Sequence, residues 1–502
     1  MVIIGGGVAG LTAAVHLAER GLRPVLLEAT PTYLGGRLCD TPAVRFAHGG
    51  QEWHFPGEHG VHGIWAPYVN LRALLDRLGV HGIFRCSEEE AWIAGDGTRM
   101  RRAAIGSAIR GGVLPAPFHY LQLFARPRFL AMLTLRDLLA LPRIFGALLA
   151  AMAVDPIAEQ HPLKDTTLAD FTTGWSPQLQ RFFASLARSG LGAHPEQVPA
   201  AGFIAFLRFY TLLRRDAWAF SYLKTTGGTG IVTPLVAAIT AHGGTIRQDA
   251  RVIQLEQLPN GWQIHYQHGD SVQTIAARYV VLATDAPAAE QLLCSSTATA
   301  AAARALRFPA GVPTAIIRIW FATQPQRGPS SGIFSGDLLV DNFFWLDRLQ
   351  DAYAAWRTTG GSALEMHIYG PAEVLDRPDA VLLAQARVDA RRAFPELAGH
   401  VVHTILQRNP ATHTRFAVGA TTEHLAVATP WPGILACGDW VAHPTPSLYL
   451  ERAVTTGMAA ANAVLVATGQ PQVVIEDPPG PEPLAAMIAA GMQRLRRRIR
   501  AR

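Results

Sequence analysis

An α/β fold with a parallel sheet is predicted by three observations near the N-terminus. A short apolar run, Val2–Ile4, is followed by glycines at positions 5, 7 and 10, in the spacing G-x-G-x-x-G. Residues 11–18 then show helical apolar periodicity, and a second apolar run, 24–27, ends at the acid Glu28. The order strand, tight turn, helix, strand and acid is the context in which this glycine spacing marks a dinucleotide-binding, Rossmann-like unit.

Each position of this unit has an expected role. Gly5 permits the tight turn, Gly7 lets a pyrophosphate approach the backbone, and Gly10 lets the helix pack closely on the strand. The free N–H groups of the first helical turn, at Val8 and Ala9, and the positive end of the helix dipole then face the phosphates. Glu28, with Ala29 next to it, is placed to bind a ribose 2′-hydroxyl, and its charge disfavours the 2′-phosphate of NADP.

In three further segments, a predicted strand is followed by glycine or polar residues. Gly35-Gly36-Arg37 follows the second strand almost at once, and the buried-strand run 279–284 ends at Ala283 and Thr284. Near the other end of the chain, an apolar strand runs into Gly438-Asp439, and a helix follows that begins near Leu450, Glu451 and Ala453. Together the four segments resemble the two ends of the flavin amine oxidase and carotenoid desaturase superfamily, from the first residues to about residue 465.

The resemblance implies the cofactor. It points to FAD rather than NAD, held in a glutathione-reductase-like domain with an inserted α+β substrate domain. It implies that Gly36 and Arg37 contact the diphosphate region, that Gly438 and Asp439 face the phosphate and ribityl region, and that the backbone near Leu450 and Glu451 reaches the isoalloxazine ring. Val252 matches the strand residue whose backbone meets the adenine. Because residues 447–450 contain no cysteine, the FAD is expected to be non-covalent.

Composition and charge limit the function classes. The 502 residues are 16% charged and 49% hydrophobic, which is typical of a globular protein of two or three domains. Six of the 44 basic residues are arginines in the last nine positions; the remaining 38 equal the 38 acidic residues, so a nucleic-acid-binding body is not indicated. Four scattered cysteines give no metal-ligand spacing and predict reduced, cytoplasmic thiols without a secretory signal.

The segments predict an interrupted domain order. Residues 1–75, 225–299 and 425–470 are assigned to a discontinuous FAD-binding domain. Residues 76–224, taken as helical, and 300–424 form a substrate- and membrane-facing domain. Residues 471–502 form a stiff proline-rich linker, which separates the tail from the body, and a basic amphipathic tail in which Leu484, Ile488, Leu495 and Ile499 share one helical face. A disordered, solvated tail is the alternative.

One segment indicates which members of the superfamily this chain resembles most. Glu58, Gly60 and His62, with Tyr68 and Asn70 after them, look like the E-x-G-x-H…Y-x-N segment of plant- and cyanobacterial-type phytoene and ζ-carotene desaturases. Gly60 is therefore added to the FAD contacts, and Glu58, His59 and His62 are the candidate catalytic residues. The alternatives are that the histidines pack or cap and that Glu58 is a surface acid.

The predicted reaction is FAD-dependent dehydrogenation of a carotenoid or related polyisoprenoid, with hydride transfer to flavin N5. Its expected partners are a lipophilic substrate, a membrane surface to which the protein binds peripherally, and quinone or oxygen as electron acceptor. The apolar run 144–154 is either an entry patch for substrate or a buried core helix; it is too short to span a bilayer. Three alternatives stay open: a flavin amine oxidase, a carotenoid isomerase or squalene-type desaturase, and a flavin-fold binding subunit without catalysis. The segment Tyr449-Leu450-Glu451 favours the amine oxidase, whereas the absence of lysine in 313–321 disfavours it.

Overall fold

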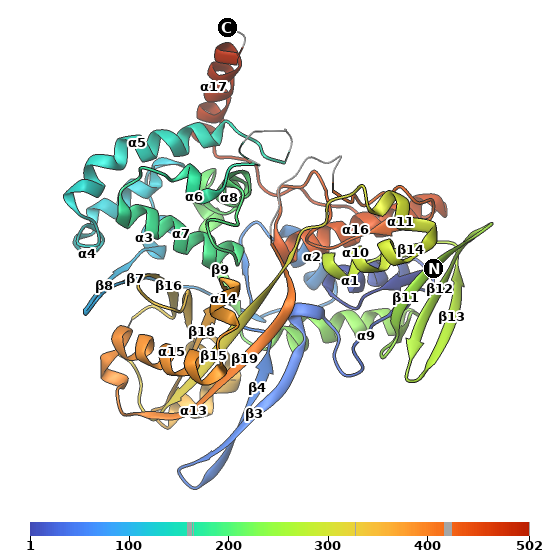
Figure 1. Cartoon of the computed structure of the whole chain (residues 1–502), viewed down its shortest axis with the longest axis horizontal. Coiled ribbons are helices and arrows are strands. Elements are labelled where there is room, and N and C mark those ends of the chain that lie inside the picture. The colour runs from blue at the N-terminus through green and yellow to red at the C-terminus, as the bar shows by residue number, and fades with distance from the viewer. Residues whose placement is uncertain (158–162, 164, 327, 416–423, 501–502) are drawn as a thin grey trace.

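A five-stranded parallel sheet forms one half of the molecule in the computed structural model, which describes residues 1–157, 163, 165–326, 328–415 and 424–500 (Figure 1). Its strand order is β10-β2-β1-β14-β20. The five strands are β1 (Val2–Ile4), β2 (Val25–Leu27), β10 (Thr245–Arg247), β14 (Val280–Leu282) and β20 (Ile434–Ala436). The predicted α/β fold class is confirmed.

Helices cover this sheet because β1, β2, β14 and β20 are apolar and nearly all buried, whereas the edge strand β10 is partly exposed. The helices α1 (Val8–Ala18) and α16 (Tyr449–Ala467) pack together at close range. A Cβ added at Gly457 of α16 would lie 2.5 Å from the carbonyl oxygen of Ala9, so glycine is required where the two helices meet. The helix α9 (Thr233–Ala241) also contacts α1.

A three-stranded antiparallel sheet and two helices pack beside the parallel sheet. They are β11 (Arg251–Leu258), β12 (Gly261–His268) and β13 (Ser271–Ala277), with α10 (Ala286–Ser295) and α11 (Thr297–Ala303). Trp262 and Tyr266 of β12 alternate inward and join the core formed with Val2, Leu282 and Ala436.

A seven-stranded sheet forms the core of the other half, seen at the lower left of Figure 1. Its order is β19-β15-β18-β17-β16-β7-β8, and all neighbouring pairs are antiparallel except β16 with β7. The strands are β7 (Glu90–Asp96), β8 (Arg99–Ala104), β15 (Gly311–Phe321), β16 (Ser331–Gly336), β17 (Asn342–Trp345), β18 (Ser362–Ile368) and β19 (Val401–Thr414). The helices following its strands are α12 (Leu346–Leu349), α13 (Ala354–Thr358), α14 (Ala372–Leu375) and α15 (Asp379–Ala393).

The expectation that residues 76–224 are helical is wrong in part. This region contains β7 and β8 of the large sheet, and also β6 (Phe84–Cys86) and β9 (Phe220–Leu223) of a small sheet, in which β9 pairs with β6 on one side and with β5 (Gly63–Trp65) on the other. β7 is buried along most of its length, so it lacks the polar–apolar alternation that would have revealed a strand. A further hairpin, β3 (Asp40–His48) with β4 (Gln51–Glu58), extends from the bottom of the molecule (Figure 1).

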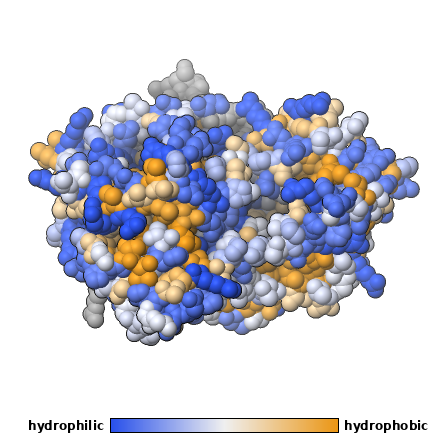
Figure 2. Space-filling view, turned by 60° about the horizontal axis from the view of Figure 1, so that its bottom comes forward, coloured by the Kyte–Doolittle hydropathy of each residue, from blue (hydrophilic) through white to orange (hydrophobic). Residues whose placement is uncertain are grey.

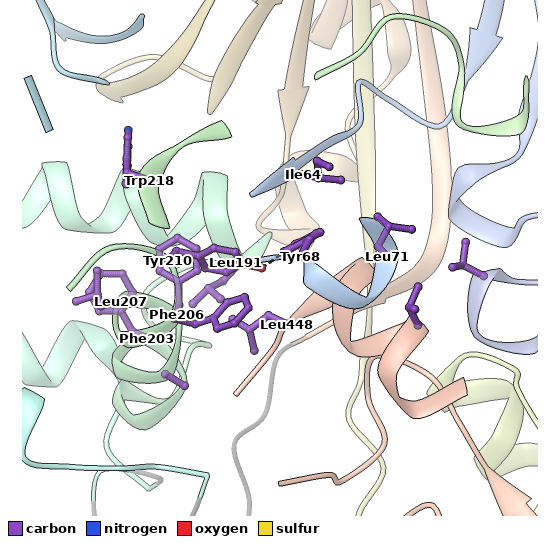
Figure 3. Close-up of a cluster of buried hydrophobic side chains, with 14 of the residues drawn as sticks. Ile64, Tyr68, Leu71, Leu191, Phe203, Phe206, Leu207, Tyr210, Trp218 and Leu448 are labelled. Atoms are coloured by element: carbon purple, nitrogen blue, oxygen red, sulfur yellow. Dashed lines mark hydrogen bonds between the residues drawn. The ribbon is translucent and has the colours of Figure 1, made fainter. Parts of the chain in front are cut away.

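The helices of this region are α2 (Val69–Arg77), α3 (Gly106–Arg110), α4 (Pro127–Leu130), α5 (Leu135–Met152), α6 (Leu168–Phe171), α7 (Pro177–Leu191) and α8 (Ala200–Leu207). Two π-helical turns lie at 208–212 and 228–232. Figure 3 shows the apolar cluster that joins this region to the rest: Phe203, Phe206 and Tyr210 lie against Leu191 and Leu448. The hydroxyls of Tyr68 and Tyr210 are 2.8 Å apart, so one donates to the other within this cluster.

The expectation that the proline-rich segment separates the tail from the body is wrong. The Asn70 side chain accepts from the N–H of Glu476 at 2.8 Å and donates to its carbonyl oxygen at 2.9 Å. The Glu482 carboxylate pairs with Arg215 at 3.0 Å. The helix α17 (Pro483–Arg500) then begins with Ala485 fully buried and contacts α5. The segment is thus fixed by side chains that proline content does not reveal.

The tail itself is helical, and its apolar face is half-buried near the start of the helix and exposed further on. Leu484 and Ile488 are half-buried against the body, whereas Leu495 is 51% exposed; the side chains of Ile499 and Arg500, and residue Arg502, lie outside the described residues. Among the described helices, none is both long enough and apolar enough to cross a membrane. On the face shown in Figure 2, most of the surface is polar, and apolar residues gather in a patch on its left half.

Candidate functional site

The carboxyl ends of β1, β2, β14 and β20 meet at one edge of the parallel sheet, and the predicted cofactor residues lie there. Gly5 has a φ of +108°, and a Cβ at this position would lie 2.7 Å from the carbonyl oxygen of Ala283. A Cβ on Gly10 would lie 2.1 Å from the carbonyl oxygen of Gly5. Both glycines are therefore required by the turn and by the close approach of helix to strand, as the motif predicted.

Gly7 has a different environment. It is the N-cap of α1, it has no side chain to cap the helix, and a Cβ added to it would meet no atom within 4 Å. The first N–H groups of a helix have no partner within the helix, so the amides at the start of α1 face open space. This is the space that a pyrophosphate would occupy.

Glu28 follows β2 at the same edge. Its carboxylate accepts from the N–H of Gly6 at 2.7 Å and from the N–H of Thr30 at 2.8 Å, and Ala29 lies between them in the turn. A carboxylate has about four lone-pair sites, so two bonds leave acceptor capacity for a ribose hydroxyl. The two backbone bonds hold the side chain against the glycine turn.

Arg37 connects two ends of the chain. Its guanidinium lies 2.6 Å from the Asp439 carboxylate, across 402 residues, and the other oxygen of Asp439 accepts from the Thr414 hydroxyl at 2.9 Å. Gly35 and Gly36, with φ of +105° and +57°, bend the backbone so that Arg37 reaches this position. The Arg37–Asp439 pair and the N-termini of α1 and α16 thus border one region, at the carboxyl ends of the parallel strands.

The other predicted cofactor residues border the same region or flank it. Thr284 follows β14 and carries a buried hydroxyl with no hydrogen-bond partner in the structure, and Gly438 follows β20 with a φ of +147°. Val252 lies in β11 opposite Tyr266, and Gly60 lies in the loop between β4 and β5. The rest lie in the first turns of two helices or beside β14: Val8, Ala9, Ala283, Leu450, Glu451 and Ala453.

The Glu451 side chain does not face this region. It is fully buried, and its two oxygens accept from the N–H of Asn70 at 2.8 Å, from the Asn70 amide at 2.9 Å and from the N–H of Leu71 at 3.0 Å. It therefore caps α2, and burial raises its pKa although these three bonds oppose the shift. Only the backbone of Glu451 is available for the role that the resemblance implied.

The three candidate catalytic residues lie close together, but one expectation about them is wrong. Glu58 is not a surface acid: it is 3% exposed, accepts from the Gln350 amide, and lies 3.5 Å from Nδ1 of His62. Burial, followed by the charges of His62 and Arg37, lowers the pKa of His59 to about 3, so His59 is neutral at neutral pH. His62 is 23% exposed, and His59 is also only partly buried.

Sequence reasoning missed a polar cluster on the large sheet beside this loop. Glu365 and His367 of β18 and Tyr369 just after it project from one face, and Arg318 of the paired strand β15 faces Glu365. A Cβ added at Gly60 would lie 3.3 Å from the His367 ring, so the loop and the cluster are in contact. The alternation Glu-x-His-x-Tyr at 365–369 is the signal that could have revealed it.

Two rings connect this cluster to the cofactor residues. The rings of Tyr369 and His413 are 6.4 Å apart, and His413 stacks on Tyr449, the first residue of α16, at 5.7 Å. Burial and the charge of Arg37 lower the pKa of His413 to about 4, against the opposing effect of Asp439. This part of the site therefore holds aromatic rings and, at His413, a neutral imidazole.

The residues present fit FAD. The open space at Gly7 suits a pyrophosphate, and the Glu28 carboxylate can accept a further hydrogen bond from a ribose. The unpartnered hydroxyl of Thr284 and the guanidinium of Arg37 supply polar groups for the rest of the cofactor. Among the described residues, no cluster of His, Cys, Asp or Glu could hold a metal ion.

Comparison with known proteins identifies the family. A family model described as flavin containing amine oxidoreductase matches residues 8–465. This chain belongs to that family. It is a flavin-dependent oxidoreductase, its cofactor is FAD, and the superfamily predicted from the sequence is confirmed.

The relatives include enzymes of carotenoids. The chain is 28% identical to a carotenoid phi-ring synthase of Streptomyces griseus, over 92% of this chain and 87% of that protein. It is 22% identical to a 15-cis-phytoene desaturase of Capsicum annuum, over 93% and 77% respectively. Among solved structures, putrescine oxidase bound to putrescine is 16% identical with a TM-score of 0.65 over 93% of this chain and 98% of that one. Cyclohexylamine oxidase from Brevibacterium oxydans is 18% identical with a TM-score of 0.64, over 93% and 99%, so both share the fold.

Proposed function

We propose that this flavin oxidoreductase dehydrogenates a carotenoid. The observation that carries the proposal is the similarity to carotenoid enzymes over more than nine-tenths of the chain, at 28% identity for a carotenoid phi-ring synthase and 22% for a phytoene desaturase. A carotenoid with an end ring is therefore the first substrate to test, and an acyclic carotene is the second. When bound, FAD accepts the hydride that leaves the substrate.

The composition of the site supports a hydrocarbon substrate. Two carboxylates near the proposed flavin position are paired with guanidinium groups, Asp439 with Arg37 and Glu365 with Arg318, while Glu58 accepts from the Gln350 amide with one oxygen and has its other oxygen 3.5 Å from His62. A protonated amine would need such a group free, because burying an unpaired cation is costly. The strand β15 has Arg318 and no lysine, and Lys224 follows β9, with its N–H bound to Ile83. Lys164 lies outside the described residues.

The apolar cluster of Figure 3 lies next to this region. Leu448 and Tyr68 belong to segments beside α16 and α2, while Phe203, Phe206 and Tyr210 come from α8 and the turn after it. These side chains exclude water from the side of the site opposite the large sheet. Exclusion of water protects a reduced cofactor and a carbocation-like substrate from side reactions.

An anaerobic experiment tests the proposal. Purified holoenzyme is mixed with a ring-bearing carotenoid, an acyclic carotene, putrescine and cyclohexylamine in separate samples, and the flavin absorbance is followed. We expect bleaching by one or both carotenoids and none by the amines. Bleaching by an amine alone would overturn the proposal. Adding a quinone or oxygen to the reduced enzyme then identifies the electron acceptor by the faster return of absorbance.

Peripheral binding to a membrane belongs to the same proposal, because the substrate dissolves in lipid. Among the described residues, seven of the fifteen exposed large hydrophobic side chains lie within positions 113–139, and Leu135 and Leu139 at the start of α5 are 72% and 75% exposed. By contrast, residues 151–154 at the end of the apolar run are buried, so the exposed surface precedes the run that the sequence singled out. Arg128 and Arg136 belong to the same stretch of chain, and α17, which contacts α5, ends in further arginines; these charges favour an anionic bilayer.

Vesicle flotation tests this surface. A variant with Leu135→Ser and Leu139→Ser should bind vesicles containing anionic lipid less than the wild type, and removal of residues 484–502 should add to the loss. The matched control carries Val381→Ser and Val388→Ser on α15, which are 48% and 38% exposed elsewhere on the molecule. Equal binding by all variants would contradict the proposed membrane surface.

A further inference from the structure

Three polar side chains follow one another on the same face at the end of β18. Glu365, His367 and Tyr369 alternate with Leu364, Met366 and Ile368, which face the hydrophobic core of the large sheet. Glu365 and His367 are buried, whereas Tyr369 is partly exposed. The strand therefore presents a line of polar groups that leads from the interior to the side where Tyr369 meets His413.

The hydrogen bonds of this line fix where its protons lie. One oxygen of Glu365 accepts from Nε of Arg318 at 2.6 Å; the other accepts from the N–H of Val61 at 2.6 Å and lies 2.7 Å from Nε2 of His367. Burial alone would raise the pKa of Glu365, but Arg318 and His367 lower it to about 2, so it is a carboxylate. Because a carboxylate only accepts, Nε2 of His367 must carry a proton.

The second nitrogen of His367 then has a lone pair. Its Nδ1 lies 2.8 Å from the Tyr369 hydroxyl, so in the neutral imidazole the hydroxyl donates to Nδ1. The Asn342 amide donates to the Tyr369 oxygen at 3.4 Å and helps to hold the phenol in place. The order carboxylate, imidazole and hydroxyl is the arrangement that makes a hydroxyl able to exchange its proton.

The end of the line lies near the proposed flavin position. Gly60, whose loop follows β4, is in contact with the His367 ring, and the rings of Tyr369 and Tyr449 both lie near the His413 ring, at 6.4 and 5.7 Å. Tyr449 begins α16, whose first turn is proposed to meet the isoalloxazine ring. A substrate placed against that ring is thus close to Tyr369.

We propose that Tyr369 accepts the proton released in the dehydrogenation, with His367 and Glu365 as positioning residues behind it. The inference rests on the proposed function, because desaturation removes a hydride from one carbon and a proton from its neighbour. The neighbouring C–H bond breaks, its electron pair becomes the second bond of the alkene, and the proton goes to the Tyr369 oxygen. The proton of that hydroxyl moves to Nδ1 of His367, and the imidazolium is paired with Glu365.

The kinetic test compares two tyrosine variants. In Tyr369→Phe, the single-turnover rate of flavin reduction by the carotenoid should fall at least 100-fold, the typical range for a lost general acid–base group. FAD content, melting temperature and the carotenoid concentration for half-saturation should stay unchanged. The control Tyr222→Phe also removes a buried hydroxyl, one that donates to Ser331, and should keep the wild-type rate. A rate for Tyr369→Phe within threefold of wild type would overturn the proposal.

A second readout needs neither substrate nor turnover. In protein labelled with ¹⁵N-histidine, the His367 signals, identified with His367→Gln, should show the tautomer protonated at Nε2. The Nδ1 signal should shift in Tyr369→Phe because its hydrogen-bond donor is gone. A tautomer protonated at Nδ1 would refute the relay whatever the substrate is, whereas failure of every carotenoid to bleach the wild type would refute the proposed function.

Discussion

Gly7 and Gly10 belong to the same motif, but the structure predicts opposite consequences of adding one methyl group to each. A Cβ at Gly7 meets no atom within 4 Å, and its φ of −71° suits any residue. Alanine at an N-cap is disfavoured, but alanine also reduces the entropy of the unfolded chain, and both effects are below about 1 kcal/mol. The free energy of unfolding of the apoprotein should therefore stay nearly unchanged in Gly7→Ala.

The affinity for FAD should change much more. The added methyl group occupies the space through which a phosphate reaches the amides at the start of α1. Loss of one charge-assisted hydrogen bond costs about 1.5–3 kcal/mol, which corresponds to weakening by roughly tenfold to a hundredfold. In Gly10→Ala, by contrast, the methyl group would lie 2.1 Å from the carbonyl oxygen of Gly5, so helix and strand must move apart and the fold itself should be destabilised.

Two measurements separate these effects. Titration of the apoprotein with FAD, followed by quenching of flavin fluorescence, gives the dissociation constant, and thermal unfolding of the same apoprotein gives the stability. Gly146→Ala, at a position in α5 where a Cβ also meets no atom within 4 Å, is the control for the methyl group alone. Wild-type FAD affinity in Gly7→Ala would refute the assignment of this space to the phosphates.

Three further outcomes follow from the buried groups. The pKa of His413 is lowered to about 4, so the unfolded chain binds its proton first as the pH falls below about 6.5. At pH 5 this group should cost about 2 kcal/mol of stability relative to pH 7, and His413→Asn should show a smaller loss of melting temperature between these pH values. Glu451→Ala leaves buried amide donors at the start of α2 without an acceptor and should lower the free energy of unfolding by about 3 kcal/mol, whereas Glu451→Gln should lose less; equal losses would argue against the capping role. Ile488→Asp should loosen α17 from α5 and speed proteolysis after residue 482, while Met487→Asp, at 65% exposure, should not; equal cleavage would contradict the docking of this helix.

The parallel sheet could be predicted because its information is local. Strand, glycine turn, helix and acid follow one another within 28 residues, and the turn conformations at Gly5 and the packing at Gly10 leave few alternatives to glycine. In the large sheet, the pairing of β16 with β7, more than 200 residues earlier, could not be predicted, since no local pattern encodes a partner so distant.

The candidate site shows the same division. Arg37 and Asp439 were each predicted from their own motif, and the structure brings them to 2.6 Å. The polar line at 365–369 was overlooked because its residues lie on a strand that looked like ordinary sheet core. Only the pairing of β15 with β18 places Arg318 opposite Glu365 and makes that strand chemically distinct. The role of the Glu451 side chain was hidden for the same reason, as its partners lie about 380 residues away.

The Arg37–Asp439 pair also has a consequence for how the protein is made. The ribosome synthesises Arg37 early, but its partner and the helix α16 emerge only after more than four hundred further residues. The first βαβ segment can fold long before then, with its glycine turn formed and its flavin-facing side incomplete. Tight loading of the cofactor is therefore a late step of biogenesis, and a nascent chain arrested before residue 430 should retain little FAD, however well its N-terminal half has folded.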